Sequence, residues 1–266
     1  MEQSKENRFS ASRLNTYKLC PAKYKWEQDV PFKPLISYLM LGDAVHKTLE
    51  LCTKSTSLQA LWSMLATYWP KNGWKSPEQE KECWESACRC LAGYHVNPMA
   101  KLSAFAKERW MRFEWVDSLF VGKIDRIDMD PLGNFIVTDY KTGKGPNSLQ
   151  KLRDSFQTVL YHYGVMQMFG VYFERVKIRY FFLEYGNLIE VPYTRKDAYK
   201  GFNTLYKVVK GIKAHEFPKK SCWLCGYCAY RNICLSKDEQ ALEPAKKEPS
   251  AYLGGAVLET IAKEIE

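Results

Sequence analysis

The chain has 266 residues, of which 46% are hydrophobic and 14% aromatic, and this composition indicates a folded protein and excludes a disordered one. Its apolar runs fall short of the roughly 20 residues that a membrane helix needs, which excludes an integral membrane protein. The net charge is +9, and residues 237–266 carry four lysines and seven acids, so the preceding 236 residues carry about +12. This excess favours a polyanionic partner.

The first hundred residues show mainly helical patterns. A short helix that ends near Cys20 is expected within residues 10–27. A second helix carries His46, around which apolar residues recur at helical spacing. Two further helices are expected at 58–69 and 78–94, on either side of a loop that contains proline and glycine. We interpret residues 55–100 as a helical insertion. Its tryptophans could stack on unpaired bases, although core packing explains them more simply.

A β-hairpin is expected in the middle of the chain. Its strands are residues 119–128 and 135–141, with turn-forming residues between them. If the loop has three residues, Asp125 lies directly opposite Asp139, and Lys141 shares the face of Asp139 because side chains alternate along a strand. Two facing carboxylates repel each other unless a cation lies between them. The pattern therefore predicts a metal site.

The chemistry of such a site follows from its residue types. Carboxylates suit Mg²⁺ or Mn²⁺, which prefer oxygen ligands and keep several waters. Such an ion polarises a phosphate oxygen and lowers the pKa of a bound water. Lys141 would orient or deprotonate that water, or stabilise charge that develops on the phosphate. On these residues alone, the alternative is a solvated hairpin whose outer face happens to carry acids and a lysine.

Beyond the hairpin, a helix over 150–169 places Gln157 and Tyr161 on one face. A second hairpin is expected at 175–183 and 188–193, and a helix is expected at 195–213. Residues 237–266 are expected to form a linker with a short C-terminal segment. We expect residues 1–236 to form a single domain.

The cysteines bear on redox environment and on metal binding. Their number, nine, is odd, and the polar start of the chain has no signal peptide, so a disulfide framework is not expected. We therefore expect a cytoplasmic, reducing location. The C-x2-C-x5-C spacing of Cys225, Cys228 and Cys234 suits thiolates that converge on one centre. From spacing alone, zinc is the commoner occupant.

Four motifs in order, Gly42-x3-His46, Gly122-x2-Asp125, Asp139-x-Lys141 and Gln157-x3-Tyr161, resemble those of PD-(D/E)XK nucleases of the RecB type. The resemblance runs from about Ser10 to Cys234. It implies an α/β, restriction-endonuclease-like fold, in which helices flank a central mixed β-sheet.

The resemblance also implies roles for individual residues. His46, Asp125 and Asp139 would be metal ligands, and Lys141 would be catalytic together with the two aspartates. Gln157 and Tyr161 would contact DNA near the scissile phosphate. Many relatives have glutamate where this chain has Asp139, and aspartate is an accepted variant. A further acid occurs in some relatives, and Glu108 and Glu114 compete for that position.

The cysteine spacing resembles that of AddB-type nuclease domains and of the Cas nuclease of CRISPR adaptation, which carry a [4Fe–4S] cluster. The resemblance implies that Cys20, Cys225, Cys228 and Cys234 hold such a cluster and clasp the N- and C-terminal segments together. Structural Zn²⁺ is the alternative occupant. Cys222 is a departure from the pattern, because it could complete a local site without Cys20.

These observations predict a metal-dependent DNA nuclease, with exonuclease action on single-stranded or frayed DNA ends implied by the resemblance. Two alternatives stay open: partner-dependent trimming of DNA fragments for CRISPR adaptation, and a non-catalytic, cluster-stabilised DNA-binding subunit. The chain has no Walker A motif, so unwinding would come from a helicase or from a recombination or adaptation partner.

Overall fold

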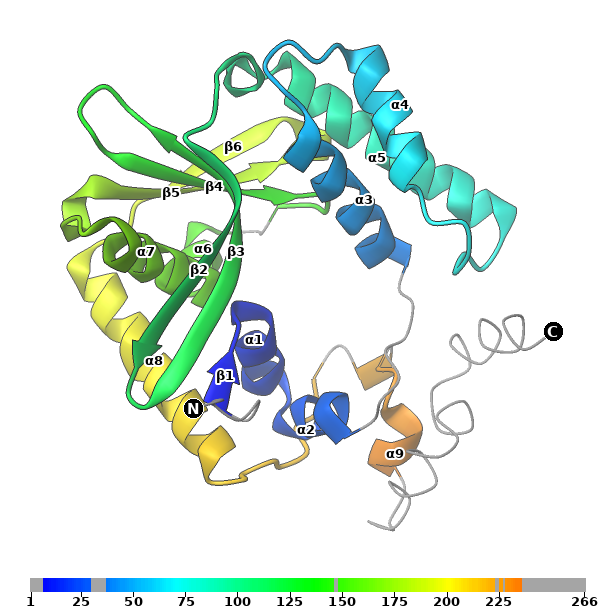
Figure 1. The fold of residues 1–266 in the computed structure, drawn as a ribbon. Helices are drawn as coiled ribbons and strands as arrows, with labels where there is room; N and C mark the ends of the chain where they lie inside the picture. The colour runs from blue at the N-terminus through cyan, green and yellow to red at the C-terminus, as the bar shows by residue number, and fades with distance from the viewer. Residues whose placement is uncertain (1–6, 30–36, 146–147, 223–224, 227, 236–266) are drawn as a thin grey trace.

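In the computed structural model, residues 7–29, 37–145, 148–222, 225–226 and 228–235 are described, and they form a mixed sheet with helices packed on both of its faces (Figure 1). The segment 237–266, expected to be a linker with a short C-terminal segment, lies outside the described residues. Among the described helices, none is long and apolar enough to cross a membrane.

The sheet contains both parallel and antiparallel pairs. Its strands are β1 (Arg8–Phe9), β2 (Ala106–Trp115), β3 (Ser118–Met129), β4 (Phe135–Lys141), β5 (Val176–Phe182) and β6 (Asn187–Val191). They run in the order β1-β3-β4-β5-β6, and β2 also pairs with β3. The pairs β1–β3 and β4–β5 are parallel, and the other three are antiparallel. The predicted central mixed sheet is therefore confirmed, while the two-residue strand β1 was not predicted.

The helices largely follow the predicted pattern. They are α1 (Ala11–Leu19), α2 (Pro21–Asp29), α3 (Ser37–Leu51), α4 (Leu58–Tyr68), α5 (Pro77–Val96), α6 (Leu149–Arg153), α7 (Phe156–Phe169), α8 (Arg195–Lys213) and α9 (Arg231–Leu235), with single 3₁₀ turns at Pro98–Lys101, Phe173–Arg175 and Leu183–Tyr185. The expected insertion at 55–100 thus consists of α4, α5 and a 3₁₀ turn.

The short helix expected within 10–27 and ending near Cys20 is α1, which ends at Leu19. The backbone of Cys20 is extended with φ −153°, and a further helix, α2, which was not expected, starts at Pro21. Proline suits a first helical turn because it has no N–H to donate. The helix expected over 150–169 breaks before Ser155, whose side chain accepts from the backbone N–H of Gln157 and caps α7.

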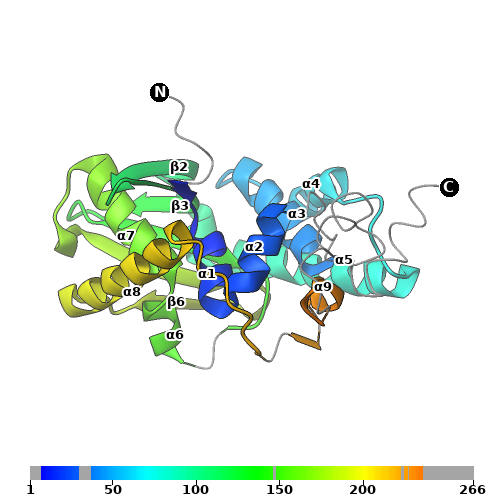
Figure 2. The ribbon, with the colours of Figure 1, turned by 90° about the horizontal axis from the view of Figure 1, so that it is seen from below.

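Side chains alternate between two cores across the sheet. On one face, the strands pack against α1, α7 and α8, and Tyr180 and Phe182 belong to this core. On the other face, Tyr140 and Phe181 pack against α3, α4 and α5. Figure 2 shows α1 and α2 between α7 and α8 on one side and α3, α4 and α5 on the other. Trp62, Trp69 and Trp84 of the insertion are partly buried against the second core, which supports packing as the role of these three residues.

The β3–β4 hairpin has the predicted three-residue loop. The backbone N–H of Asp130 donates to the carbonyl of Asn134 at 3.0 Å, and Gly133 in the loop has φ +77°. The ladder runs through Arg126 opposite Thr138. One further step in this register sets Asp125 opposite Asp139, as the three-residue loop predicts.

Candidate functional site

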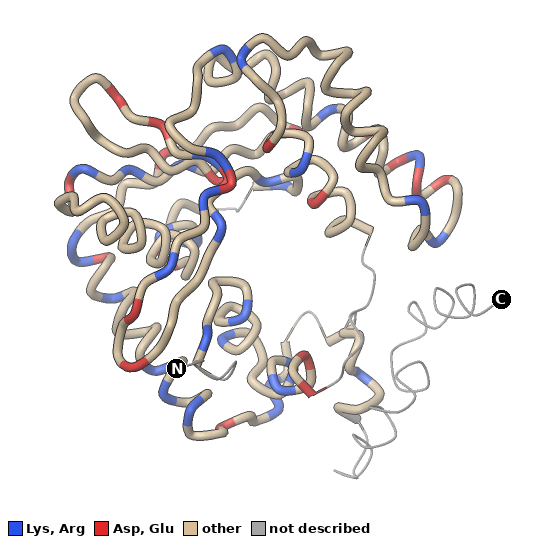
Figure 3. The backbone as a smooth tube through the Cα atoms, viewed as in Figure 1, with Lys and Arg blue, Asp and Glu red and all other residues tan. Residues whose placement is uncertain are grey.

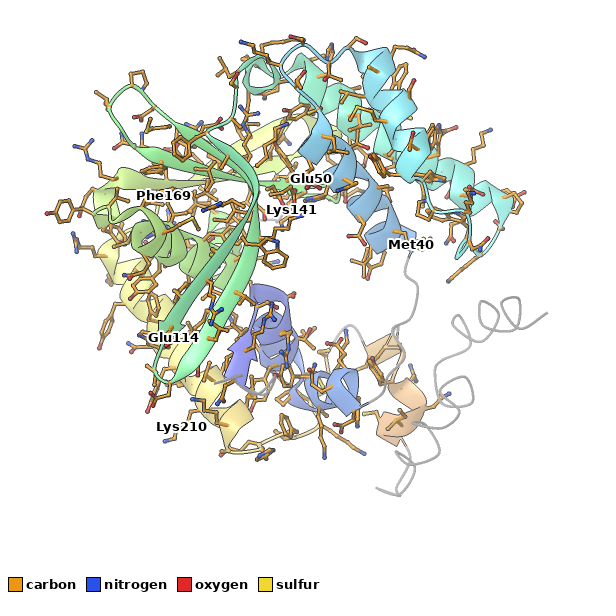
Figure 4. The ribbon with its side chains drawn as sticks, in the orientation of Figure 1. Met40, Glu50, Glu114, Lys141, Phe169 and Lys210 are labelled. Atoms are coloured by element: carbon orange, nitrogen blue, oxygen red, sulfur yellow. The ribbon has the colours of Figure 1, made fainter. Side chains whose placement is uncertain are left out.

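A cavity of about 500 Å³ lies where α3, β2, β3, β4 and α7 meet. Its lining includes every residue that was predicted to bind metal, act in catalysis or contact DNA near the scissile bond: His46, Asp125, Asp139, Lys141, Gln157 and Tyr161. Glu50 on α3 and Lys141 on β4 are two of the lining residues labelled in Figure 4. The structure therefore brings together six residues that come from four separate elements of the chain.

An acidic centre occupies one side of the cavity. His46 Nδ1 lies 3.1 Å from Asp125 Oδ1, and the other Asp125 oxygen accepts the backbone N–H of Tyr140 at 2.7 Å. Potential ligand atoms of His46, Glu108 and Asp125 all lie within 4.8 Å of one another, the one such group within the part of the chain that the structure describes. A nitrogen and two carboxylates at this spacing could hold a divalent cation.

The alternation of side chains between the two faces of the sheet is interrupted in β2 at Glu108. Lys107 Nζ donates to carbonyl oxygens at the end of α3, whereas Met111 and Phe113 pack in the core under α7. In a regular strand these three odd-numbered residues would share one face. Glu108 has φ +49°, which L-amino acids rarely adopt, and its carboxylate lines the cavity.

The structure distinguishes Glu108 from Glu114, the two candidates for the additional acidic residue that some relatives carry. Glu108 lies in the cavity and pairs with Lys123 Nζ at 2.5 Å. Glu114 is exposed opposite Leu119, and Figure 4 labels it near the far end of the β2–β3 hairpin, away from Lys141. Of the two, Glu108 is therefore the candidate ligand.

A hydrogen-bonded group of charged and amide side chains occupies the other side. Lys141 Nζ lies 2.7 Å from Asp139 Oδ2 and donates to Gln157 Oε1 at 2.8 Å. Gln157 Nε2 donates to Asp139 Oδ1 at 2.6 Å and to the Tyr161 hydroxyl at 3.1 Å. Gln157 and Tyr161, expected to contact DNA, thus also hold the predicted catalytic pair.

Tyr161 reaches the cavity because β3 has no side chain at Gly122. A Cβ atom at that position would lie 2.8 Å from the Met111 side chain and 3.3 Å from the Tyr161 ring. The Tyr161 hydroxyl donates to the carbonyl of Lys123 at 2.8 Å, which fixes α7 against β3. Glycine here permits the close approach of helix and strand.

Burial and the crowding of acids shift the pKa values in the cavity. Burial raises the pKa of Asp139 to about 6, the Asp125 charge acts in the same direction, and Lys141 opposes both. Burial lowers the pKa of His46, but the hydrogen bond to Asp125 and the nearby acids outweigh it and raise the value to about 9. Three carboxylates lie close to one histidine in this cavity, an arrangement that a bound cation would stabilise.

Four charged residues of the cavity lining were not singled out from the sequence: Asp43, Lys47, Glu50 and Lys123. Lys123 pairs with Glu108, and Glu50 pairs with Lys47 at 2.8 Å. The position of Lys123, two residues before Asp125 on the same strand, is the signal that could have identified it. Glu50, one helical turn after His46 on α3, could have been found in the same way.

The cysteines form a separate group between the N-terminal helices and α9. Cys20 is buried with Trp26, Tyr230 and Ile233, and Cys228 and Cys234 pack against this cluster. Burial raises the pKa of the Cys228 and Cys234 thiols, and nearby charges on Cys20 and Cys225 contribute to both shifts. The structure thus brings the four expected ligands together, although residues 20 and 225 are far apart in the chain.

Cys222 lies next to this group. Its Sγ is 4.0 Å from Cys225 Sγ, and its backbone N–H donates to the same sulfur at 3.2 Å. A backbone N–H bond to sulfur stabilises a thiolate that ligates a metal. Cys222 therefore contacts a candidate ligand directly.

Comparison with known proteins agrees with this architecture. The model of the PD-(D/E)XK nuclease superfamily matches residues 8–235. The chain is similar to a crystal structure from Eubacterium rectale named "Putative exonuclease", with 16% identity, a TM-score of 0.58, and coverage of 91% of this chain and 94% of that chain. The crystal structure of SSO0001 has 14% identity and a TM-score of 0.43, and 89% and 90% of the two chains are covered. No curated protein sequence matches the chain.

Proposed function

The chain belongs to the PD-(D/E)XK nuclease superfamily, and from that premise we propose that it hydrolyses DNA phosphodiesters as a metal-dependent exonuclease on single-stranded or frayed ends. Its central mixed sheet flanked by helices is the restriction-endonuclease-like fold expected from the sequence. The observation that carries the proposal is the cavity in which Lys141 pairs with Asp139 beside the group of His46, Glu108 and Asp125.

The donor set fits a divalent cation. Carboxylates of Asp125, Asp139 and Glu108, with the imidazole of His46, would hold Mg²⁺ or Mn²⁺. When bound, the cation supplies Lewis-acid polarisation of the phosphodiester and eases deprotonation of water. The hydrogen bond to Asp125 and the nearby acids, which outweigh burial and raise the pKa of His46, support this assignment.

The protein's own groups would orient the reactants. The Lys141 ammonium would donate a hydrogen bond to a non-bridging phosphate oxygen or to the attacking water, on the side where charge develops. Gln157 would hold the side chains of Lys141 and Asp139 in position through its hydrogen bonds to both. The leaving oxygen would take its proton from solvent, since the cavity is open to it at exposed residues such as Leu39.

We propose a [4Fe–4S] cluster at Cys20, Cys225, Cys228 and Cys234, with a structural role. The C-x2-C-x5-C spacing of Cys225, Cys228 and Cys234, with Cys20 packed in one cluster with Cys228 and Cys234, supports this proposal through the resemblance to cluster-binding nuclease domains. The binding free energy of the iron–sulfur cluster would add to the free energy of folding.

The test is cleavage of end-labelled DNA by anaerobically purified protein. Linear single-stranded, linear duplex and circular single-stranded DNA are incubated with Mg²⁺ or Mn²⁺, using the wild type, Lys141→Ala and the control Lys196→Ala on the exposed side of α8. We expect metal-dependent cleavage of linear single strands by the wild type and the control, and loss of cleavage in Lys141→Ala.

Each other outcome has its own meaning. Cleavage of the circular strand would contradict exonuclease action. Equal cleavage by all three proteins would contradict the assignment of Lys141. Binding of DNA without cleavage by the wild type would favour the partner-dependent or the non-catalytic alternative.

A further inference from the structure

Trp110 is an exposed tryptophan, whereas tryptophan is highly buried on average. Trp110 is 63% exposed, and it is the one tryptophan among the exposed large hydrophobic residues of the described part of the chain. Beside a candidate nuclease site, an exposed indole offers an apolar face on which an unpaired base can stack. Trp110 is on β2, two residues from Glu108 of the acidic centre.

The hairpin places this ring beside the cavity. Trp110 lies directly opposite Lys123 in the β2–β3 register, so their side chains share a face and their Cβ atoms are about 5 Å apart. Lys123 Nζ reaches from that face into the cavity, where it pairs with Glu108. The indole therefore lies on the face of the hairpin from which Lys123 reaches the cavity.

A cationic side chain follows on the same face. Arg112 is exposed, lies opposite Val121 and is two residues beyond Trp110, a rise of about 7 Å along the strand. Basic residues recur along this hairpin in Figure 3. From Glu108 outward, one side of β2 thus presents a carboxylate, an aromatic ring and a guanidinium in succession.

Tyr38 provides a second exposed ring at the rim. It is 65% exposed on the first turn of α3 and lines the cavity from the side of that helix. The cavity is therefore flanked by aromatic rings on two elements, α3 and β2. Rings of this kind stack on bases of any identity, provided that the bases are unpaired.

Resting on the proposed function, we propose that Trp110 is a stacking platform for an unpaired base next to the scissile phosphodiester and that Arg112 binds the adjoining phosphate. A base within a duplex presents no free face to the indole. The pair would thereby favour single-stranded over duplex DNA through contacts that do not depend on the base sequence.

The test measures binding by fluorescence anisotropy in a Lys141→Ala background with Mg²⁺, so that the DNA stays intact. The DNAs are a labelled single-stranded oligonucleotide, the same oligonucleotide with single abasic positions, and a blunt duplex. The proteins carry Trp110→Ala, Trp110→Phe, Arg112→Ala or the control Tyr172→Ala, whose ring is 81% exposed elsewhere on the molecule.

We expect Trp110→Ala to raise the Kd for the single strand by about 5- to 100-fold. Trp110→Phe should retain most of the affinity of the background protein, and Tyr172→Ala should leave the Kd unchanged. An abasic position that faces Trp110 should weaken binding of the background protein and remove the effect of Trp110→Ala. Arg112→Ala should weaken binding to intact and abasic strands alike and reduce the salt slope by about one.

Different results would contradict the stacking role of Trp110 and the proposed nuclease function. Equal losses on single strand, abasic strand and duplex, or no loss at all, would overturn the stacking role while DNA binding itself stands. If neither the wild type nor the background protein binds any of the three DNAs, the proposed function is overturned, and this inference with it. Circular dichroism of each variant verifies that folding is intact.

Discussion

The side-chain amide of Gln157 donates to Asp139 Oδ1 at 2.6 Å, across the boundary between α7 and β4. Its oxygen accepts from Lys141 Nζ at 2.8 Å, so one amide satisfies an acid and a base that are adjacent on the same strand face. An amide is the side chain that can do both, because it carries a donor and an acceptor. This geometry indicates a positioning role for Gln157.

Gln157→Ala should therefore lower kcat by about 10- to 100-fold with little change in KM, because Asp139 and Lys141 lose their common partner. Gln157→Glu should be at least as damaging, since it turns a carboxylate toward Asp139. Steady-state cleavage of a labelled oligonucleotide measures both constants. A rise in KM with unchanged kcat would instead identify Gln157 as a DNA contact alone.

Glu108→Gln should weaken Mn²⁺ binding by about 10- to 100-fold, because it removes one charge from the group with His46 and Asp125. Glu114→Gln on the same strand is the matched control and should leave the affinity unchanged. Titration calorimetry with Mn²⁺ in the absence of DNA measures this directly. Equal affinities of the two variants would exclude Glu108 as a ligand.

Cys20→Ser should remove iron and sulfide from the anaerobically purified protein and lower its thermal midpoint by about 10 °C, because the N-terminal helices lose their bond to the C-terminal cysteines. Cys88→Ser on α5 is the control. Iron and sulfide analysis with visible absorbance near 400 nm gives the occupancy. One equivalent of zinc in a colourless wild-type protein would contradict the cluster.

The stability of the fold should fall between pH 6.5 and pH 4 through His162. This side chain is 2% exposed between the rings of Phe173 and Tyr193, and burial lowers its pKa to about 4. The unfolded chain binds a proton below its ordinary pKa of about 6.5 while the folded chain does not, so acid favours unfolding. The contribution is complete above pH 6.5 and decreases by up to about 3 kcal/mol as pH approaches 4.

Urea unfolding at pH 7.5 and pH 5 measures this contribution. His162→Phe should reduce the difference in unfolding free energy between the two pH values, and His215→Asn on the surface should preserve it. A difference that is unchanged in His162→Phe would assign the acid sensitivity to other groups.

The β2–β3 turn offers a stabilising substitution. Val116 and Asp117 both have positive φ, +49° and +51°, in the two-residue loop between Trp115 and Ser118. Asn-Gly suits such a turn, whereas a β-branched valine is strained there. Val116→Asn with Asp117→Gly should raise the free energy of unfolding by about 1 kcal/mol. Urea denaturation with an unchanged m-value checks it, and a lower midpoint would contradict it.

Local patterns were enough to predict much of this fold. The hairpin register that sets Asp125 opposite Asp139 follows from turn chemistry and from the two-residue period of a strand, and both are properties of neighbouring residues. The helix of His46 and the helix of Gln157 and Tyr161 follow in the same way from apolar spacing. The order of these motifs then indicated the family.

The tertiary structure decided what local patterns leave open. Glu108 and Glu114 lie on one strand, and a positive φ at Glu108, together with the helices packed around it, turns only the former into the cavity. The exposure of Trp110 beside Lys123 and the packing of Cys20 with Cys228 and Cys234 depend on how separate segments of the chain pack together. Spacing along a sequence describes neighbours within an element, whereas a site depends on how separate elements pack against one another.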